Sequence, residues 1–230
     1  MFTGIVQAVA SVSALTERPG LRSFTLAFPH GFCDGLEIGA SVSVDGVCLT
    51  VTERVGSDAA NFDVMQQSLS LTTLDTLQVG SRINVERAAR DGAEIGGHPL
   101  SGHVDFQATL ASLRQPENNH VLRIAVPAPW MRYVFAKGYI AINGASLTVS
   151  DANKAEGWFE VWLIPETLRM TTFADKGVGD ALNIEVERGT QVMVDTVRAA
   201  VEERLGPLLA PLTELLRERG VDVETLLIDQ

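Results

Sequence analysis

The sequence predicts an all-β protein made of two tandem copies of one small antiparallel domain, followed by a helical tail. The first observation is an internal repeat, in which the run Gly46–Val51 returns as Gly144–Val149, an offset of 98 residues from position 46 to position 144. The second is a series of short alternating runs, separated by Gly, Pro and Asp, up to about residue 187. The third is the helical spacing of apolar residues after residue 190.

The repeat extends over most of the chain. Three further pairs of segments keep the same order and nearly the same offset: Thr3–Val6 with Ser101–Val104, Gln67–Thr73 with Glu166–Thr172, and Asn84–Glu86 with Asn183–Glu185. A period near 98 residues is longer than a solenoid repeat of about 20–50 residues and is the size of a small domain. We therefore expect domains over residues 1–97 and 98–189 and a helical segment over 190–230, with a hinge near 91–98.

The strand candidates follow the chain in order. Thr3–Val6 and its repeat are expected to be fully used first strands. The other candidates are Ser23–Phe28, Ser41–Val44, Val47–Thr52, Phe62–Met65 and Arg82–Glu86 in the first copy, and Val121–Val126, Tyr139–Gly144, Ala145–Val149, Phe159–Ile164 and Leu182–Glu187 in the second. Asp45-Gly46 between two such runs predicts a β-hairpin. Short strands with these turns favour a sandwich or barrel for each copy, and no strand–long helix–strand rhythm indicates a parallel sheet.

The tail predicts two amphipathic helices. In the first, Thr190–Leu205, apolar residues recur at helical spacing after Thr190 as N-cap, and Gly206-Pro207 ends it. The second carries the stripe Leu208, Leu209, Leu212, Leu215 and Leu216, with Gly220 as C-cap. An apolar stripe needs cover, so these helices either pack on a domain or associate with copies of themselves.

Charge and cysteine content exclude several classes of protein. The net charge of −11, from 29 acidic and 18 basic residues, argues against a nucleic-acid partner. No apolar run reaches the ~18–20 residues needed to cross a membrane, and the first residues lack the basic and long apolar regions typical of a signal peptide. The two cysteines, Cys33 and Cys48, form no disulfide framework, so we expect a cytoplasmic protein. The histidines at 30, 98, 103 and 120 lack metal-site spacing.

Candidate reactive residues lie where the two copies differ. Cys48 is either a small buried apolar residue or a nucleophile, and its repeat partner Ser146 favours two reactive groups that face two ligands. His103 replaces Ile5 and either moves protons near neutral pH or is a polar strand residue with satisfied hydrogen bonds. His98 follows two glycines and is expected to be a loop residue.

The charged residues of the second copy are a further difference. The run Glu166–Arg169 offers a carboxylate, a hydroxyl and a guanidinium in one helical turn, or else an exposed ion pair that adds little stability. The first copy has Gln67–Ser70 there and loses both charges, so the copies are not expected to do the same job. Lys137 stands opposite Gly39 in the repeat and is either a solvated surface lysine or a site residue.

Five motifs together resemble the riboflavin synthases of the alpha-chain type: Met1–Val6, Asp45–Thr52, Gly96–His103, Asn143–Thr148 and Ile164–Leu168. The resemblance covers residues 1 to about 200. It implies two six-stranded Greek-key barrels and a C-terminal helix that assembles a homotrimer. It also implies that two molecules of 6,7-dimethyl-8-ribityllumazine become riboflavin and a ribitylamino-pyrimidinedione by transfer of a four-carbon unit, with no cofactor or metal. The resemblance also implies lumazine synthase as a protein partner.

The resemblance also implies the site residues. The catalytic candidates are Cys48, His103, Ser146 and Glu187. The pocket of the N-terminal barrel would comprise Gly4, Ile5, Val6, Cys48, Leu49, Thr50, Asp63, Val64, Met65, Gln66, Gln67, Ser68, Gly102, His103 and Val104. The pocket of the C-terminal barrel would comprise Lys137, Ser146, Leu147, Thr148, Trp162, Leu163, Ile164, Pro165, Glu166 and Thr167.

Two departures from the family pattern keep other functions in view. Many members have Glu-Thr-Leu-Arg where this chain has Gln67–Ser70, and the family usually has Asp where this chain has Glu187. The first departure favours the alternative of a non-catalytic lumazine- or flavin-binding protein of the same fold. A third alternative, the flavin-binding barrel of a reductase, would need a nucleotide-binding domain, for which the residues after 190 are too few.

Overall fold

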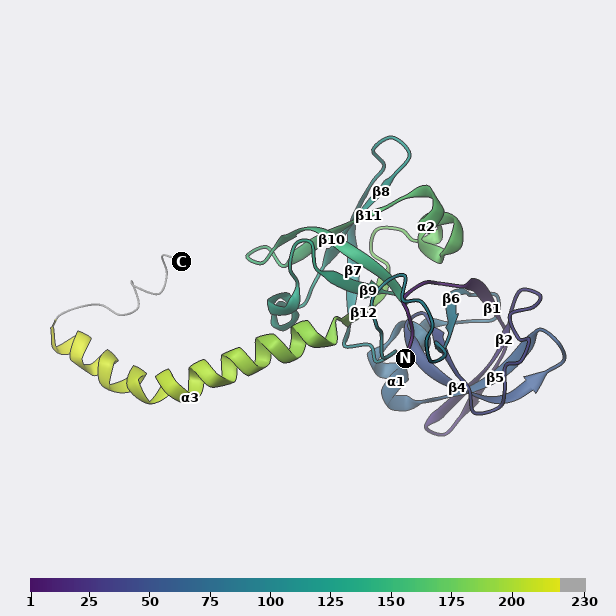
Figure 1. Ribbon diagram of the computed structural model, residues 1–230, viewed down its shortest axis with the longest axis horizontal. Helices are drawn as coiled ribbons and strands as arrows, with labels where there is room; N and C mark the ends of the chain where they lie inside the picture. The colour runs from purple at the N-terminus through teal and green to yellow at the C-terminus, as the bar shows by residue number, and fades with distance from the viewer. Residues whose placement is uncertain (220–230) are drawn as a thin grey trace. The chain divides into compact units, whose positions relative to one another are not determined.

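Each copy of the repeat forms a closed six-stranded antiparallel barrel in the computed structural model, which describes residues 1–219 (Figure 1). The first barrel consists of β1 (Ala8–Arg18), β2 (Leu21–Ala27), β3 (Ser41–Val44), β4 (Val47–Val55), β5 (Ala59–Met65) and β6 (Arg82–Arg87). The second consists of β7 (Phe106–Arg114), β8 (His120–Ala125), β9 (Tyr139–Ile142), β10 (Ala145–Asn153), β11 (Trp158–Leu163) and β12 (Ala181–Val186). The predicted all-β class is confirmed.

The two barrels have the same topology. Around the first barrel the strands follow the order β1-β2-β5-β4-β3-β6, and the second repeats this order six strands later. Strand β2 returns to lie beside β5, as in a Greek key. Short helices connect the strands: α1 (Gln66–Leu71), α2 (Pro165–Met170), and the 3₁₀ helices η1 (Thr73–Thr76), η2 (Ala128–Tyr133) and η3 (Thr172–Asp175).

The predicted hairpins are present in both barrels. Strand β3 pairs with β4 across Asp45-Gly46, where φ is 44° and 85°, and β9 pairs with β10 across Asn143-Gly144, where φ is 45° and 78°. Two successive residues with positive φ are what a tight two-residue hairpin of the right twist requires. The Asp-Gly and Asn-Gly pairs therefore fix the register of both hairpins.

The segments before the two barrels are not the first strands that the repeat suggested. Thr3–Val6 and Ser101–Val104 lie outside the strands, and the neighbouring Phe2 and Leu100 pair with each other through two backbone hydrogen bonds of 2.8 and 3.0 Å. Each segment then crosses to the other barrel, because Val6 packs in the core of the second barrel and Val104 in the core of the first. The true first strands, β1 and β7, begin after the crossing. We call Thr3–Val6 the first crossed segment and Ser101–Val104 the second crossed segment.

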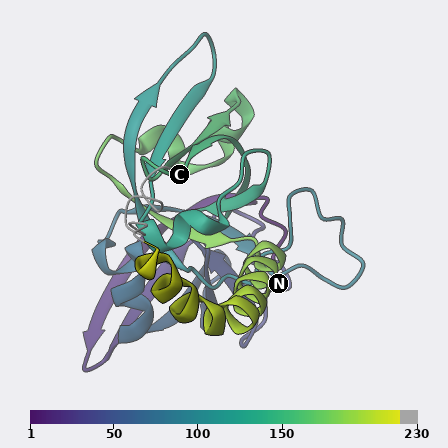
Figure 2. The ribbon, with the colours of Figure 1, turned by 90° about the vertical axis from the view of Figure 1, so that its left-hand side faces the viewer.

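Two equivalent asparagines, Asn84 and Asn183, make hydrogen bonds between the two barrels. The Asn84 side chain donates to the Asn143 carbonyl and accepts from the Thr172 N–H, at 3.0 and 2.8 Å. The Asn183 side chain makes the matching bonds to the Asp45 carbonyl and the Thr73 N–H, at 2.9 and 2.8 Å. Residues Met1–Arg188, which hold both barrels, accordingly form one compact unit (Figure 2).

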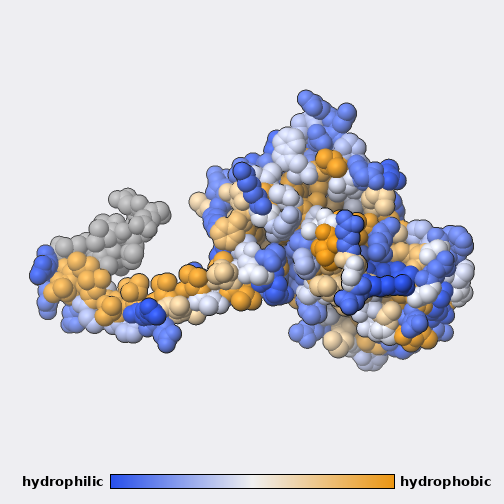
Figure 3. Space-filling model, in the orientation of Figure 1, coloured by the Kyte–Doolittle hydropathy of each residue, from blue (hydrophilic) through white to orange (hydrophobic). Residues whose placement is uncertain are grey.

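One long helix, α3 (Arg188–Glu218), replaces the two predicted tail helices. It continues through Pro207 and Pro211, although proline usually ends a helix. The apolar side chains along it are exposed, including Val197, Val201 and Leu205 (Figure 3). Because the helix is solvated, water can satisfy the carbonyl groups that the prolines leave unpaired. The proposed cap Gly220 lies outside the described residues.

None of the helices in residues 1–219 is both long and apolar enough to cross a membrane.

Candidate functional site

Two small pockets lie at equivalent places in the two barrels. The first, of about 270 Å³, is called the Cys48 pocket, and the second, of about 310 Å³, is called the Ser146 pocket. The Cys48 pocket is lined by Val47, Cys48, Gln67, Ser68, Leu71, Thr72, Gly102, His103 and Val104. The Ser146 pocket is lined by Gly4, Ile5, Val6, Ala145, Ser146, Leu147, Glu166, Thr167, Met170 and Thr171.

Each pocket is built from both copies of the repeat. The Cys48 N–H donates to the Gly102 carbonyl at 2.8 Å, and the Ser146 N–H donates to the Gly4 carbonyl at 2.8 Å. Gly4–Val6 were expected in the pocket of the N-terminal barrel; in the structure they line the Ser146 pocket, and Ile5 also lines a cavity beside the first barrel. Gly102, His103 and Val104 of the second crossed segment line the Cys48 pocket.

The crossed segments approach the pockets so closely that only glycine fits at the contact. Gly4 and Gly102 have φ of 75° and 80°, in the left-handed region that favours glycine. A Cβ atom at Gly4 would lie 2.5 Å from Cβ of Ser146, and one at Gly102 would lie 2.6 Å from Cβ of Cys48. The glycines of the repeated Thr-Gly and Ser-Gly pairs are thus a steric requirement of the pockets.

The Cys48 pocket brings together a thiol and an imidazole. Cys48 is the second residue of strand β4 and is half-buried, so it is not the fully buried apolar residue of the alternative interpretation. The exposed His103 lines the same pocket from the second crossed segment. Gln67 and Ser68 add amide and hydroxyl groups from helix α1. A thiol and an imidazole in one pocket are suited to nucleophilic addition and proton transfer.

Ser146, which lines the Ser146 pocket, is paired with a histidine outside the lining that the sequence did not predict. Nδ1 of His98 lies 2.6 Å from Oγ of Ser146. His98 is indeed in a loop, but its side chain is only 3% exposed, and its ring stacks on Tyr139 with centroids 5.2 Å apart. Burial lowers the pKa of His98, and the nearby charge of Glu187 opposes this change. A neutral His98 can therefore accept the Ser146 proton, and the candidate Glu187 acts on it through its charge.

A signal for His98 was present in the sequence, in the two glycines before it. A Cβ atom at Gly97 would lie 2.6 Å from the Thr3 carbonyl oxygen and 2.6 Å from Cβ of Ser146. The loop therefore passes directly over the first crossed segment and the serine, which places the next residue inside the site.

Several predicted binding residues do not line either pocket. Leu49, Val64 and Leu163 are buried in the barrel interiors, while Met65, Trp162 and Ile164 are about half exposed or more. Thr50, Asp63, Gln66, Thr148, Pro165 and Lys137 also lie outside the two linings. Conversely, Val47, Leu71, Thr72, Ala145, Met170 and Thr171 line the pockets without having been predicted.

Two charged residues of the second copy have distinct environments. Glu166 and Arg169 form an exposed ion pair of 2.6 Å, as one alternative predicted, and the Arg169 guanidinium lowers the pKa of Glu166. Lys137 has φ of 68°, a conformation that is unfavourable for a residue with a side chain. Its repeat partner Gly39 adopts the same conformation, and both N–H groups donate to β-strand carbonyls.

Comparisons with known proteins also find two copies of one ligand-binding domain in this chain. The family model described as "Lumazine binding domain" matches residues 3–88 and again 101–187. Riboflavin synthase of Escherichia coli (strain K12) is 43% identical over 215 residues, covering 93% of this chain and 100% of that protein. Riboflavin synthase of Mycobacterium tuberculosis (strain ATCC 25618 / H37Rv) is 38% identical over 201 residues, covering 87% and 100%. The crystal structure of LumP complexed with riboflavin superposes with a TM-score of 0.74 at 25% identity, covering 81% of this chain and 100% of that one.

Proposed function

The chain belongs to the riboflavin synthase family, and we propose that it catalyses the reaction for which that family is named. Two molecules of 6,7-dimethyl-8-ribityllumazine are converted to riboflavin and 5-amino-6-(ribitylamino)pyrimidinedione, as one lumazine transfers a four-carbon unit to the other. The observation that carries this proposal is the presence of two equivalent pockets with different reactive groups in one chain. A dismutation requires one donor and one acceptor from a single substrate, and two unequal pockets meet that requirement.

The reactive groups divide between the pockets. In the Cys48 pocket, the thiolate adds to an electrophilic ring carbon and the imidazole of His103 moves protons. Beside the Ser146 pocket, His98 accepts the serine proton at their 2.6 Å contact, and the charge of Glu187 partly offsets the burial that lowers the pKa of His98. Much of the acceleration comes from holding two flat heterocycles in contact, which removes the entropy cost of their encounter.

We propose a homotrimer held together by helix α3. The support is its row of exposed apolar side chains, Val192, Met193, Val197, Val201, Leu205, Leu208, Leu209, Leu212 and Leu215. Such a row is unfavourable in water and is covered when helices associate. In a trimer, the Cys48 pocket of one subunit would face the Ser146 pocket of the next. We also propose a cytoplasmic location, association with lumazine synthase, and the division of the chain into residues 1–97, 98–189 and 190–230.

The experiment is to incubate the purified chain with the lumazine and to follow flavin absorbance. The proposal expects riboflavin to form well above the rate of the same solution without protein. A rate equal to that control, with a folded protein that binds the lumazine, would contradict it.

A second candidate is a protein that binds a lumazine or flavin without reaction. The observation that favours it is helix α1, where Gln67–Ser70 lacks the charges that α2 has in Glu166 and Arg169. Ligand titration separates the two candidates. One tight site per chain without turnover supports the binder, whereas two occupied sites with turnover support the enzyme.

A further inference from the structure

Two buried carboxylates occupy the same place in the two barrels. Glu86 on β6 is 2% exposed and Glu185 on β12 is 4% exposed. Each accepts three hydrogen bonds from one crossed segment. Glu86 accepts from the N–H and hydroxyl of Thr3 at 2.6 and 2.7 Å and from the Gly4 N–H at 3.0 Å. Glu185 accepts from the N–H and hydroxyl of Ser101, both at 2.7 Å, and from the Gly102 N–H at 3.0 Å.

Each carboxylate is connected to the pocket of the opposite barrel. Glu86 holds Gly4, whose carbonyl accepts from the Ser146 N–H in the second barrel. Glu185 holds Gly102, whose carbonyl accepts from the Cys48 N–H in the first barrel. One glycine thus separates each buried carboxylate from the backbone of a reactive residue.

The hydrogen bonds to each carboxylate also stabilise its charge. Burial raises the pKa of Glu86 and Glu185, while the bonds from Thr3 and Gly4, or from Ser101 and Gly102, lower it. The N-terminal ammonium further lowers the pKa of Glu86, and Asp105 raises that of Glu185. A buried carboxylate without these donors would be strongly destabilised, so each glutamate and its crossed segment depend on one another.

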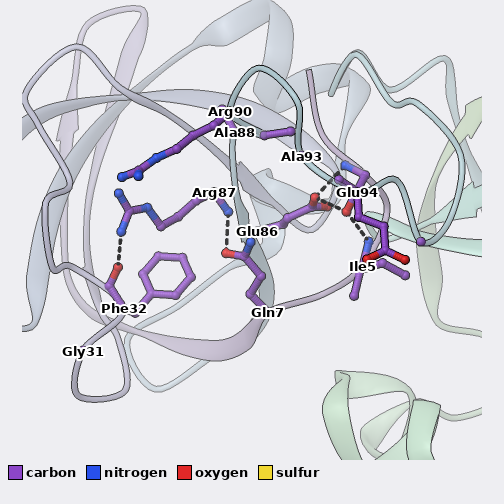
Figure 4. A pocket seen from close by; sticks show the side chains of 13 residues that line it. Ile5, Gln7, Gly31, Phe32, Glu86, Arg87, Ala88, Arg90, Ala93 and Glu94 are labelled. Atoms are coloured by element: carbon purple, nitrogen blue, oxygen red, sulfur yellow. Dashed lines mark hydrogen bonds between the residues drawn. The ribbon is translucent and has the colours of Figure 1, made fainter.

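Figure 4 shows the surroundings of Glu86 at a cavity of about 690 Å³. The Glu86 carboxylate lies beside Ile5 with its hydrogen bonds drawn, away from the guanidinium of Arg87. Arg87 donates instead to the carbonyls of Phe32, Asp34 and Gly35. Arg87 therefore binds a loop of the first barrel, and Glu86 is the charged residue that binds the first crossed segment.

We propose that Glu86 and Glu185 are positioning residues, each of which fixes a crossed segment against the reactive residue of the opposite barrel. Glu185 fixes the backbone that carries His103 to the Cys48 pocket. Glu86 fixes the backbone that carries Ile5 to the Ser146 pocket. The catalytic importance of this positioning rests on the proposed function. The positioning itself does not: each glutamate is expected to affect the pocket of the opposite barrel and not that of its own barrel.

The test compares the matched variants Glu185→Gln and Glu86→Gln with riboflavin as the probe. Each variant keeps the side-chain volume but replaces a charged double acceptor by a single neutral one. Occupancy of the Cys48 pocket is measured as the protection of the Cys48 thiol from alkylation, since Cys33 is fully buried. Occupancy of the Ser146 pocket is measured in the same way in a Cys48→Ser/Ser146→Cys background, where the introduced thiol is the reporter.

The proposal expects Glu185→Gln to weaken riboflavin protection of the Cys48 thiol by about tenfold or more, the size expected for the loss of hydrogen bonds to a charged group. Protection in the Ser146 pocket should change by less than about threefold, which is the effect expected for a distant site. Glu86→Gln should give the reverse pattern. Equal weakening of both pockets by either variant, or no weakening, would overturn the proposal. If either variant does not fold, Ser101→Ala and Thr3→Val remove one hydroxyl donor each, and the same crossed pattern at smaller size is required.

This test is separate from that of the proposed function, because riboflavin binding is measured without turnover. A chain that forms no flavin but shows the crossed pattern would refute the synthase activity and support the positioning role. A chain that forms flavin but lacks the crossed pattern would support the synthase activity and refute the positioning role.

Discussion

The carboxyl group of Asp45 is buried at the junction of the two barrels and makes the stability of the protein depend on pH. The side chain is only 2% exposed, and its Oδ1 accepts the Asn84 N–H at 2.8 Å. Burial raises its pKa from 3.8 to about 6, although the Asn84 hydrogen bond and the charge of Lys176 act in the opposite direction. The same position in the second copy is Asn143, which cannot ionise.

The magnitude follows from the two pKa values. The difference between 3.8 and about 6 corresponds to about 3 kcal/mol, at about 1.36 kcal/mol per pH unit. Because the folded state binds the proton more tightly than the unfolded state, this stability is present below pH ~4 and is lost as the pH rises through about 6. Above that pH the folded protein carries a buried charge that costs free energy.

The perturbation is Asp45→Asn, which copies the residue of the second barrel. We expect the free energy of unfolding of this variant, relative to the natural chain, to improve by about 3 kcal/mol between pH 4 and pH 8. Urea unfolding at a series of pH values and fixed protein concentration measures it. The matched control Asn143→Asp should lose stability as the pH rises. Curves for Asp45→Asn and the natural chain that stay parallel from pH 4 to pH 8 would refute the reasoning.

Three further predictions concern the site and the assembly. Cys48→Ser should lower turnover far more than lumazine affinity, measured by single-turnover kinetics and titration, and equal losses would assign Cys48 to binding alone. His98→Gln should lower turnover by about 100-fold and remove the contribution of His98 to the acid side of the pH profile, because a lowered pKa keeps His98 neutral only above that pKa; an unchanged pH profile would remove His98 from the reaction. Truncation after Glu187 removes the exposed apolar face of α3 and should give monomers in sedimentation; a truncated trimer would show that the barrels themselves hold the assembly.

The repeat and the hairpins could be predicted because their signals are local. Asp45-Gly46 and Asn143-Gly144 specify tight turns by backbone conformation alone. The short alternating runs beside them specify strands that bury one face. Strand β1 (Ala8–Arg18) was missed because small residues and a register shift between Val12 and Ala14 weaken its alternation.

The crossing of the two segments could not be predicted, because each segment could pack against either of two similar barrels. Thr3–Val6 and Ser101–Val104 are near copies, so the sequence alone does not determine which barrel each one completes. That choice depends on close backbone contacts, such as those at Gly4 and Gly102. The role of His98 follows from the same contacts and was missed for the same reason. Pro207 and Pro211 do not end α3, because water can satisfy the carbonyl groups that they leave unpaired in an exposed helix.

The most direct test of the account is the stoichiometry of the reaction with the natural chain. Lumazine consumed and riboflavin formed are measured together by chromatography after a fixed time, with the pyrimidinedione as the second product. We expect two lumazines to be consumed for each riboflavin and each pyrimidinedione formed, as follows if one pocket holds the donor and the other the acceptor. Lumazine that is bound by the folded chain but never consumed would contradict it.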